Sequence, residues 1–532
     1  MKTVGETLID LLKAKGTDLV FGIPGVHTVE LYRGLGNSSI RHITPRHEQS
    51  AGFMADGYTR VSGKPGVCLI ITGPGLTNMI TPMAQAMADS IPMFVISGVN
   101  KSTAHGHYRG ALHELPDQQA MMSTVTKYSQ TLLHSDQLGE VFEKAWTLML
   151  EGRPGPVHIE IPIDVMSQKI NAPRFRSPAR GEFAAPDEAI EEIAKDCAAA
   201  QYPVILIGGG AKEANDEISE LATRLDAPVI STINARGMLA NHDLLVPASP
   251  GLESVRACLR DADLILAFGT QMGATDYDIY ENNGTPELQK FVRIDKEISQ
   301  LVTGPANDLA IVCDAKTVCK AILAKLDPQP MARNGKETAE RINEAVLEEI
   351  GPKLRHEIDI IHSVQLALPN LIFVGDSTQL VYAGNCFCRI NRVSGWFNSS
   401  VGYGSLGYGI PAAIGASLAD PKSPVVCIVG DGGAQFTLSE LGSAMDEETP
   451  VIFLVWNNSG YQEIARFMET NNITTVGVTP SAPDFVMQAK SYGMDGIRLS
   501  ALNQLADVLK AAYQARKPYL IEMPESVCGY LD

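Results

Sequence analysis

Two polar side chains late in the chain follow apolar runs, in a pattern that suits a hard metal ion. Asp431 comes directly after VVCIVG, and Asn458 comes directly after VIFLVWN. Mg²⁺ prefers oxygen ligands and usually keeps phosphate oxygens and water in its octahedral shell. Asp431 can supply a carboxylate oxygen, Asn458 an amide oxygen, and Gly460 a backbone carbonyl. These residues predict a Mg²⁺ site.

The glycines around Asp431 suit a phosphate group bound beside that ion. Gly430, Gly432 and Gly433 carry no side chains, so backbone N–H groups at the start of the next helix can approach phosphate oxygens. Ordinary turns are also rich in Gly, Asp and Asn. Such turns at the ends of two successive apolar strands are much less common, so we favour a bound phosphate.

These side chains can meet only if the two apolar runs are neighbouring parallel strands, because carboxyl ends then share one sheet edge, where ligands bind. The same alternation of short apolar runs and helical patterns continues along the whole chain and predicts an α/β protein. The predicted strands are Val67–Thr72, Met93–Ser97, Val157–Ile161, Val204–Ala211, Leu264–Thr270, Leu371–Gly375, Val425–Gly430, Val451–Trp456 and Tyr519–Met523.

The length of 532 residues indicates about three domains, at roughly 100–200 residues each. Residues 169–186 and 328–343 are polar stretches that are typical of linkers. We therefore predict three doubly wound parallel-sheet domains: residues 1–168, 187–327 and 356–532. In the middle domain, the glycines Gly208–Gly210 could cradle a phosphate or allow tight packing, and the sequence leaves both open.

Composition excludes several classes of partner. A formal net charge of -18 disfavours nucleic acid and anionic membranes. No apolar run reaches about 18 residues, and the first residues lack the apolar core of a signal peptide. Most of the nine cysteines lie in apolar runs, which is typical of buried thiols in a reducing cytosol. We expect a cytoplasmic enzyme that acts on a small molecule.

The GDG turn, followed by NN after the next strand, resembles the signature of thiamine diphosphate enzymes. The chain resembles, end to end, the branch that includes acetolactate synthases, benzaldehyde lyases and 2-oxo acid decarboxylases. The resemblance implies thiamine diphosphate with Mg²⁺, and a pyrimidine-binding, a central and a diphosphate-binding domain in that order. It also implies a homodimer or homotetramer with active sites at the subunit interface.

The resemblance assigns roles to further residues. A glutamate at the Glu48 position in this family hydrogen-bonds N1′ of the aminopyrimidine, which favours the imino form that deprotonates the thiazolium carbon. The Gly404 carbonyl would accept from the 4′-amino group, and Leu406 would hold the cofactor bent. Ser377 and Thr378 would contact the diphosphate. Without the metal motif, Glu48 would be interpreted as a carboxylate at a helix start.

The substrate loops differ from those of pyruvate decarboxylases, which carry an acidic residue after the first PG and a His-His doublet. Here Val26 and His27 follow Pro24-Gly25, which is closer to benzaldehyde lyases, and His113 stands where related enzymes carry a glutamine. His27 and His113 are candidate proton shuttles. The segments LHELPDQ and GDSTQLVYAGN resemble 2-ketoarginine decarboxylases, which implies 5-guanidino-2-oxopentanoate as a substrate.

A guanidinium group requires a carboxylate partner, and Glu463, Glu114 and Asp117 are the candidates. The implied reaction is non-oxidative decarboxylation of a 2-oxo acid to an aldehyde and CO₂. A carboligase or lyase of acetolactate synthase or benzaldehyde lyase type shares every cofactor residue and stays the alternative. A catalytically dead cofactor-binding subunit is disfavoured because all these cofactor residues are present.

Overall fold

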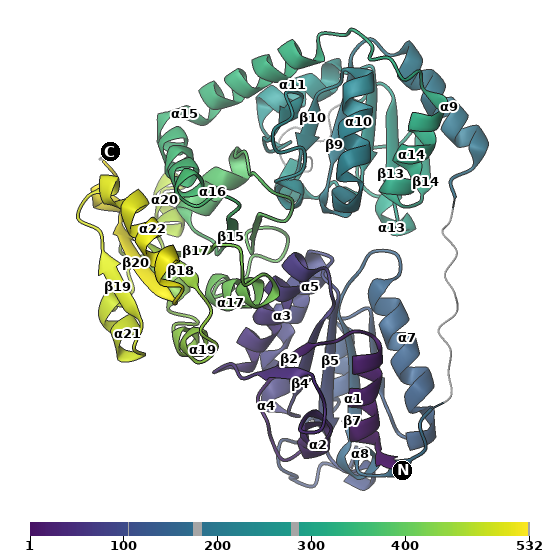
Figure 1. Cartoon of the computed structure of the whole chain (residues 1–532), viewed down its shortest axis with the longest axis vertical. Helices are drawn as coiled ribbons and strands as arrows, with labels where there is room; N and C mark the ends of the chain where they lie inside the picture. The colour runs from purple at the N-terminus through teal and green to yellow at the C-terminus, as the bar shows by residue number, and fades with distance from the viewer. Residues whose placement is uncertain (105, 174–183, 278–286, 530–532) are drawn as a thin grey trace.

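The computed structural model describes the chain except for residues 105, 174–183, 278–286 and 530–532. Three parallel six-stranded sheets, each flanked by helices, follow one another along the chain (Figure 1). The predicted α/β class with three doubly wound domains is therefore confirmed, and each predicted strand forms. Among the described residues, no helix is both long and apolar enough to cross a bilayer.

The first sheet lies in the N-terminal part of the chain, at the bottom of Figure 1. Its strands, in sheet order, are β3 (Arg41–Ile43), β2 (Leu19–Gly22), β4 (Gly66–Ile70), β5 (Met93–Val99), β7 (Val157–Pro162) and β6 (Tyr128–Thr131). Its helices are α1 (Val4–Ala14), α2 (Val29–Leu35), α3 (Glu48–Ser62), α4 (Pro74–Asn78), α5 (Ile80–Ala88), α6 (Gln118–Ser123), α7 (Leu138–Leu150) and α8 (Ile163–Met166).

The second sheet lies in the middle part, at the top of Figure 1. Its strands, in sheet order, are β11 (Leu245–Val246), β10 (Val229–Ser231), β9 (Pro203–Ile207), β12 (Leu264–Phe268), β13 (Phe291–Asp295) and β14 (Leu309–Val312). Its helices are α9 (Asp187–Ala199), α10 (Asn215–Leu225), α11 (Glu253–Asp261), α12 (Ala274–Tyr277), α13 (Ile298–Leu301) and α14 (Ala315–Lys325).

The third sheet carries the candidate metal residues. Its strands, in sheet order, are β16 (Trp396–Asn398), β15 (Ile372–Gly375), β17 (Val425–Gly430), β18 (Val451–Asn457), β20 (Tyr519–Pro524) and β19 (Asp495–Arg498). Its helices are the second half of α15 (Gly335–Ala367), which is interrupted at Gly351 and packs its first half on the central domain, and α16 (Gln379–Cys386), α17 (Gly409–Ala419), α18 (Asp431–Ala434), α19 (Glu440–Asp446), α20 (Gln462–Thr470), α21 (Phe485–Ser491) and α22 (Leu505–Ala515). The strand order reverses between β15 and β17, and ligands of doubly wound sheets bind at such a point.

The two predicted linkers fare differently. Residues 174–183 of the first lie outside the described residues, while its start forms β8 (Lys169–Ile170), which pairs with β1 (Lys2–Thr3). The second prediction was wrong from Gly335 onward, because α15 begins there. The polar composition hides a helical spacing of apolar residues, and Ala339, Ile342 and Val346 are buried along one face.

The first and third domains share one hydrophobic core, in which α3 crosses α17 (Figure 1). Glycine allows the two backbones to approach closely. A Cβ on Gly57 would lie 2.0 Å from the Ala412 carbonyl oxygen, and one on Gly415 would lie 1.9 Å from that of Met54. Because α3 begins with Glu48, this crossing fixes the position of that glutamate relative to the third domain of the same chain.

A buried ionic network lies beside this crossing. The guanidinium of Arg60 donates to Asp56 Oδ1 and to Asp89 Oδ2, both at 2.6 Å. Tyr408, just before α17, donates its hydroxyl to the same oxygen of Asp56. Burial raises the pKa of Asp89 to about 6 despite the attraction of Arg60. Arg60 therefore compensates two buried carboxylates at the junction of the two domains.

We expect Arg60→Leu to destabilise the protein by about 3–5 kcal/mol, because removing one partner leaves buried carboxylates uncompensated. Arg33→Leu is the matched control, since Arg33 pairs with Glu30 at the surface and such pairs contribute about 0–1 kcal/mol. Urea unfolding followed by circular dichroism measures both. Equal midpoints for the two variants would show that the network does not stabilise the junction.

Candidate active site

Asp431 and Asn458 meet at the carboxyl edge of the third sheet. Their strands β17 and β18 are parallel neighbours, with Gly430 opposite Trp456. The backbone N–H of Asn458 donates to Asp431 Oδ1 at 3.4 Å. The Asp431 side chain is buried, with the residue 1% exposed, which raises its pKa, and its Oδ2 accepts no hydrogen bond from the described residues. A buried carboxylate without full compensation favours a cation.

Three oxygens converge at this point. With the Asn458 amide oriented so that its Nδ2 donates to Gln379 Oε1 at 3.0 Å, its oxygen lies 3.1 Å from Asp431 Oδ1 and 2.9 Å from the Gly460 carbonyl oxygen. Three acceptors facing one another repel unless a donor or a cation lies between them. One carboxylate, one amide and one carbonyl oxygen are the ligand types that a hard divalent cation takes. The residues present therefore fit a Mg²⁺ ion.

The glycine turn beside these oxygens has no room for side chains. A Cβ on Gly432 would lie 2.5 Å from the ring of Tyr461, and one on Gly430 would lie 2.9 Å from Thr378 Oγ1. On Gly433 it would lie 3.2 Å from Asp376 Oδ1. Gly432 and Gly433 lie in the short helix α18 itself, whose first N–H groups have no acceptor within the helix. Its backbone is thus open to the oxygens of a phosphate group.

Ser377 and Thr378 lie at the same sheet edge, in the turn between β15 and α16. Ser377 Oγ accepts from Ser400 Oγ at 2.8 Å, and Thr378 is the residue before α16. Asp376, which precedes them, is fully buried and accepts from the backbone N–H groups of Ser377 and Gly409. Burial raises the pKa of Asp376 to about 6. This carboxylate ties the turn to the start of α17.

The loop between β16 and α17 carries Gly404 and Leu406. Gly404 is exposed with a φ of 75°, a conformation that favours glycine, and Leu406 is partly buried. Gln85 of the first domain holds this loop, because its Oε1 accepts from Ser405 N at 3.2 Å and from Ser405 Oγ at 2.8 Å. Gln85 Nε2 also donates to Asp89, so the ionic network supports the loop.

Glu48 is the first residue of α3 in the first domain. Asn78 Nδ2 donates to Glu48 Oε2 at 2.9 Å, and Oε1 lies against Gly75, 3.2 Å from where a Cβ would stand. No hydrogen bond or ion pair among the described residues joins Glu48 to Asp431 or Asn458. Within one chain, the glutamate and the oxygen cluster are therefore not in direct contact.

His27 and His113 lie together, with ring centroids 5.5 Å apart. His27 is buried, and its Nε2 is 3.1 Å from Asn100 Oδ1. Burial lowers the pKa of His27, which favours its neutral ring. His113 has a φ of 61°, which is unusual for a residue other than glycine, and its carbonyl packs against Gly73. The two rings form one imidazole pair.

The three candidate carboxylates have different surroundings. Glu114 accepts from the backbone N–H groups of Gly110 and Ala111 at 2.8 and 3.0 Å, so it holds its own loop. Asp117 caps α6 by accepting from Ala120 N. Glu463 is exposed in the first turn of α20 and pairs only loosely with Arg466 at 3.4 Å. Of the three, Glu463 has the carboxylate that is most open to a ligand.

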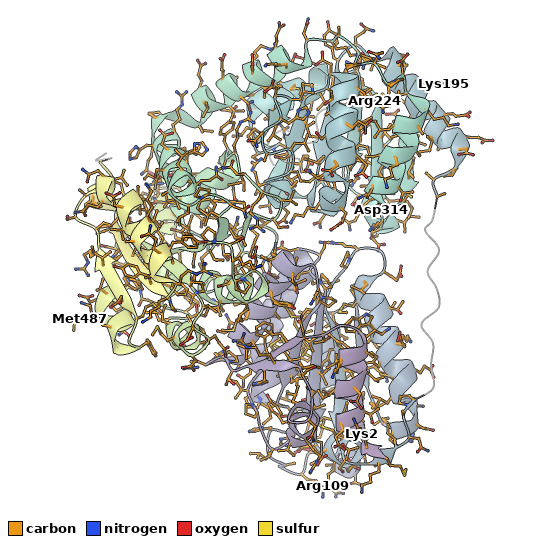
Figure 2. All side chains as sticks on the ribbon, viewed as in Figure 1. Lys2, Arg109, Lys195, Arg224, Asp314 and Met487 are labelled. Atoms are coloured by element: carbon orange, nitrogen blue, oxygen red, sulfur yellow. The ribbon has the colours of Figure 1, made fainter. Side chains whose placement is uncertain are left out.

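The loop of His113 and Glu114 includes Arg109, which lies at the end of the first domain remote from the central domain (Figure 2). The glycines Gly208–Gly210 lie elsewhere, on a cavity of about 920 Å³ that all three domains line. A Cβ on Gly208 would lie 2.2 Å from the Gly269 carbonyl oxygen. Tight packing accounts for that glycine.

The sequence did not predict the residues that hydrogen-bond to the site residues and fix their positions. Gln379 and Trp456 support Asn458, and Gln85 supports the Gly404 loop. Gln379 is adjacent to the residues we had singled out, and that proximity was the only available signal. For Gln85, 320 positions from Ser405, the sequence offers none.

Comparison with known families identifies the class of the protein. The family model described as "Thiamine pyrophosphate enzyme, N-terminal TPP binding domain" matches residues 2–121, the central domain model matches residues 190–322, and the C-terminal TPP binding domain model matches residues 376–523. The chain belongs to the thiamine pyrophosphate enzyme family. The cofactor expected from the sequence, thiamine diphosphate, is thus confirmed at the level of the family.

Individual relatives extend over almost the whole chain. A probable 2-ketoarginine decarboxylase of Pseudomonas aeruginosa is 39% identical, over 98% of this chain and 94% of its own length. The acetolactate synthase isozyme 1 large subunit of Escherichia coli is 31% identical, over 93% of this chain and 88% of its own. A probable acetolactate synthase large subunit of Methanocaldococcus jannaschii is 30% identical, over 97% and 91%.

Proposed function

We propose that this protein uses thiamine diphosphate and Mg²⁺ to decarboxylate a 2-oxo acid to an aldehyde and CO₂, with 5-guanidino-2-oxopentanoate as the substrate. The observation that carries the cofactor part is the buried Asp431 carboxylate, whose Oδ2 has no partner among the described residues, beside Asn458 and the glycine turn. The similarity to a probable 2-ketoarginine decarboxylase over nearly the whole length supports the reaction and the substrate.

In this proposal, Asp431, Asn458 and the Gly460 carbonyl hold Mg²⁺. The backbone of Gly430, Gly432 and Gly433 and the hydroxyls of Ser377 and Thr378 bind the diphosphate. The Gly404 carbonyl and Leu406 place the pyrimidine. Bound thiamine diphosphate supplies a nucleophilic carbon and an electron sink for the substrate carbonyl.

The protein's own residues then handle protons. Glu48 holds or returns a proton at N1′ of the pyrimidine, with Asn78 keeping its carboxylate in position. His27 and His113 deliver a proton to the carbon that lost CO₂. Burial lowers the pKa of His27 and so favours its neutral ring, which releases a proton readily once it has taken one up. Glu463, Glu114 and Asp117 are the proposed partners of the guanidinium, with Glu463 first.

We further propose a homodimer or homotetramer in the cytoplasm, with Glu48 of one subunit completing the Asp431 site of another. Apolar side chains that are exposed near candidate site residues support this arrangement: Val26, next to His27, is 64% exposed, and Phe436, after the glycine turn, is 55% exposed. Exposed apolar groups at functional sites are typical of surfaces that a partner covers.

A carboligase of acetolactate synthase type is the second candidate, favoured by the 31% identity to the Escherichia coli enzyme. The two functions differ in their products. We expect incubation with 5-guanidino-2-oxopentanoate to yield CO₂ and one equivalent of aldehyde, with Glu463→Gln raising KM for this acid more than for an uncharged 2-oxo acid. Faster formation of acetolactate or acetoin from pyruvate would instead establish the carboligase.

A further inference from the structure

We propose that Gln379 sets the orientation of the Asn458 amide, so that Asn458 presents its oxygen to the metal ion. Gln379 is thus a positioning residue that acts through Asn458. This inference rests on the proposed Mg²⁺ site and adds to it the part of the protein that keeps the site ready for a cation. The argument depends on which hydrogen-bonding atoms can donate and which can accept.

A chain of two hydrogen bonds runs from Trp456 through Gln379 to Asn458, and we call it the relay. It begins at the indole of Trp456. Its Nε1–H donates to Gln379 Oε1 at 2.9 Å, and an indole nitrogen can donate but never accept. The Gln379 side chain must therefore turn its oxygen toward Trp456. The same oxygen accepts from Asn458 Nδ2 at 3.0 Å. With its nitrogen held there, Asn458 has to direct its oxygen to the opposite side.

That opposite side is the oxygen cluster. If the Asn458 amide turned over, its nitrogen could donate to Asp431 Oδ1 and to the Gly460 carbonyl, which would satisfy both. Its oxygen would then face Gln379 Oε1 at 3.0 Å, an unfavourable contact between two acceptors. Gln379 cannot turn to relieve this contact, because its Nε2 would meet the Trp456 N–H. The relay therefore prevents the rotation of the Asn458 amide that would satisfy the oxygen cluster with an amide nitrogen instead of a metal ion.

Burial strengthens the control that these donors and acceptors exert on the orientation of the Asn458 amide. Trp456 is 2% exposed and Gln379 is 6% exposed, so water cannot readily replace a lost partner. Gln379 Nε2 has no hydrogen-bond partner among the described residues. The hydrogen bonds of this side chain are thus made by its oxygen alone, to Trp456 and Asn458. A packing role needs no such arrangement.

The test compares two substitutions at this position. Gln379→Leu keeps similar bulk but removes the acceptor, whereas Gln379→Glu keeps an acceptor for both donors. We expect Gln379→Leu to weaken Mg²⁺ binding about 10–100-fold, the usual effect of losing a residue that orients a metal ligand, and Gln379→Glu to bind Mg²⁺ at least as tightly as the wild type. Calorimetric titration of Mg²⁺ into protein with saturating thiamine diphosphate measures this, independently of turnover.

Trp456→Phe tests the relay from its other end and serves if the leucine variant does not fold. It should weaken Mg²⁺ binding in the same direction, and the double variant should be no weaker than Gln379→Leu alone, because both act through one chain of bonds. Unchanged Mg²⁺ affinity in Gln379→Leu, or equal loss in the Leu and Glu variants, would overturn the relay while leaving the metal site intact. A wild-type protein that takes up thiamine diphosphate without any divalent cation would overturn the metal assignment, and the relay with it.

Discussion

Replacing Glu48 with glutamine is expected to lower turnover of a 2-oxo acid by about 10²–10⁴-fold, the usual contribution of a positioned proton-transfer group. Glutamine keeps the length of the side chain and an oxygen that can still accept from Asn78 Nδ2, which now lies 2.9 Å from Oε2. It cannot exchange a proton with N1′ of the pyrimidine. The fold should survive, because the side chain lies at the start of α3 rather than in the core.

Two measurements separate this role from a structural one. The first is the rate at which bound thiamine diphosphate exchanges its C2 proton for deuterium, which should fall together with turnover. The second is the affinity for thiamine diphosphate, which should change far less. Glu140→Gln, on the exposed side of α7, is the matched control. Turnover near that of the wild type in Glu48→Gln would exclude the N1′ role.

The sequence predicted those parts of the site that are local in the chain. A buried parallel strand is a run of apolar residues, and the polar residue after it is visible as a break in that run. Asp431 and Asn458 were found in this way, and the sheet does bring them together. The α/β class followed from the same rhythm, since each strand and its helix are adjacent in sequence.

What depends on distant contacts could not be predicted. The sequence indicates that Glu114 and Asp117 are acidic, but not that their oxygens are occupied by backbone N–H groups of their own loops. It shows Arg60 in a helix, but not that Arg60 lies between Asp56 and Asp89. Such pairings follow from tertiary packing, which leaves no periodic pattern in one sequence. The polar face of α15 likewise concealed a helix, because only its buried residues carry the period.

The Asp431→Asn variant is expected to have opposite effects on the free and the loaded protein. In the free protein, Asp431 is a buried carboxylate with an unpartnered oxygen, so a neutral amide of the same shape should not lower the melting temperature. In the presence of Mg²⁺ and thiamine diphosphate, the variant loses the one charged ligand of the site. Affinity for thiamine diphosphate should fall by at least about 100-fold, beyond the 10–100-fold cost of perturbing residues that only orient ligands.

Thermal melting reports both effects in one experiment. A ligand at 100 times its dissociation constant stabilises a folded protein by about 2.7 kcal/mol. Mg²⁺ and thiamine diphosphate should therefore raise the melting temperature of the wild type but not that of Asp431→Asn. Asp446→Asn is the control, because its exposed carboxylate pairs with Arg46 at the surface. An Asp431→Asn variant that gains as much as the wild type would show that Mg²⁺ is held elsewhere. A lower melting temperature of the ligand-free variant would show that the Asp431 carboxylate stabilises the fold. A carboxylate that waits for a cation is instead uncompensated in the ligand-free protein, so its neutralisation should not destabilise it.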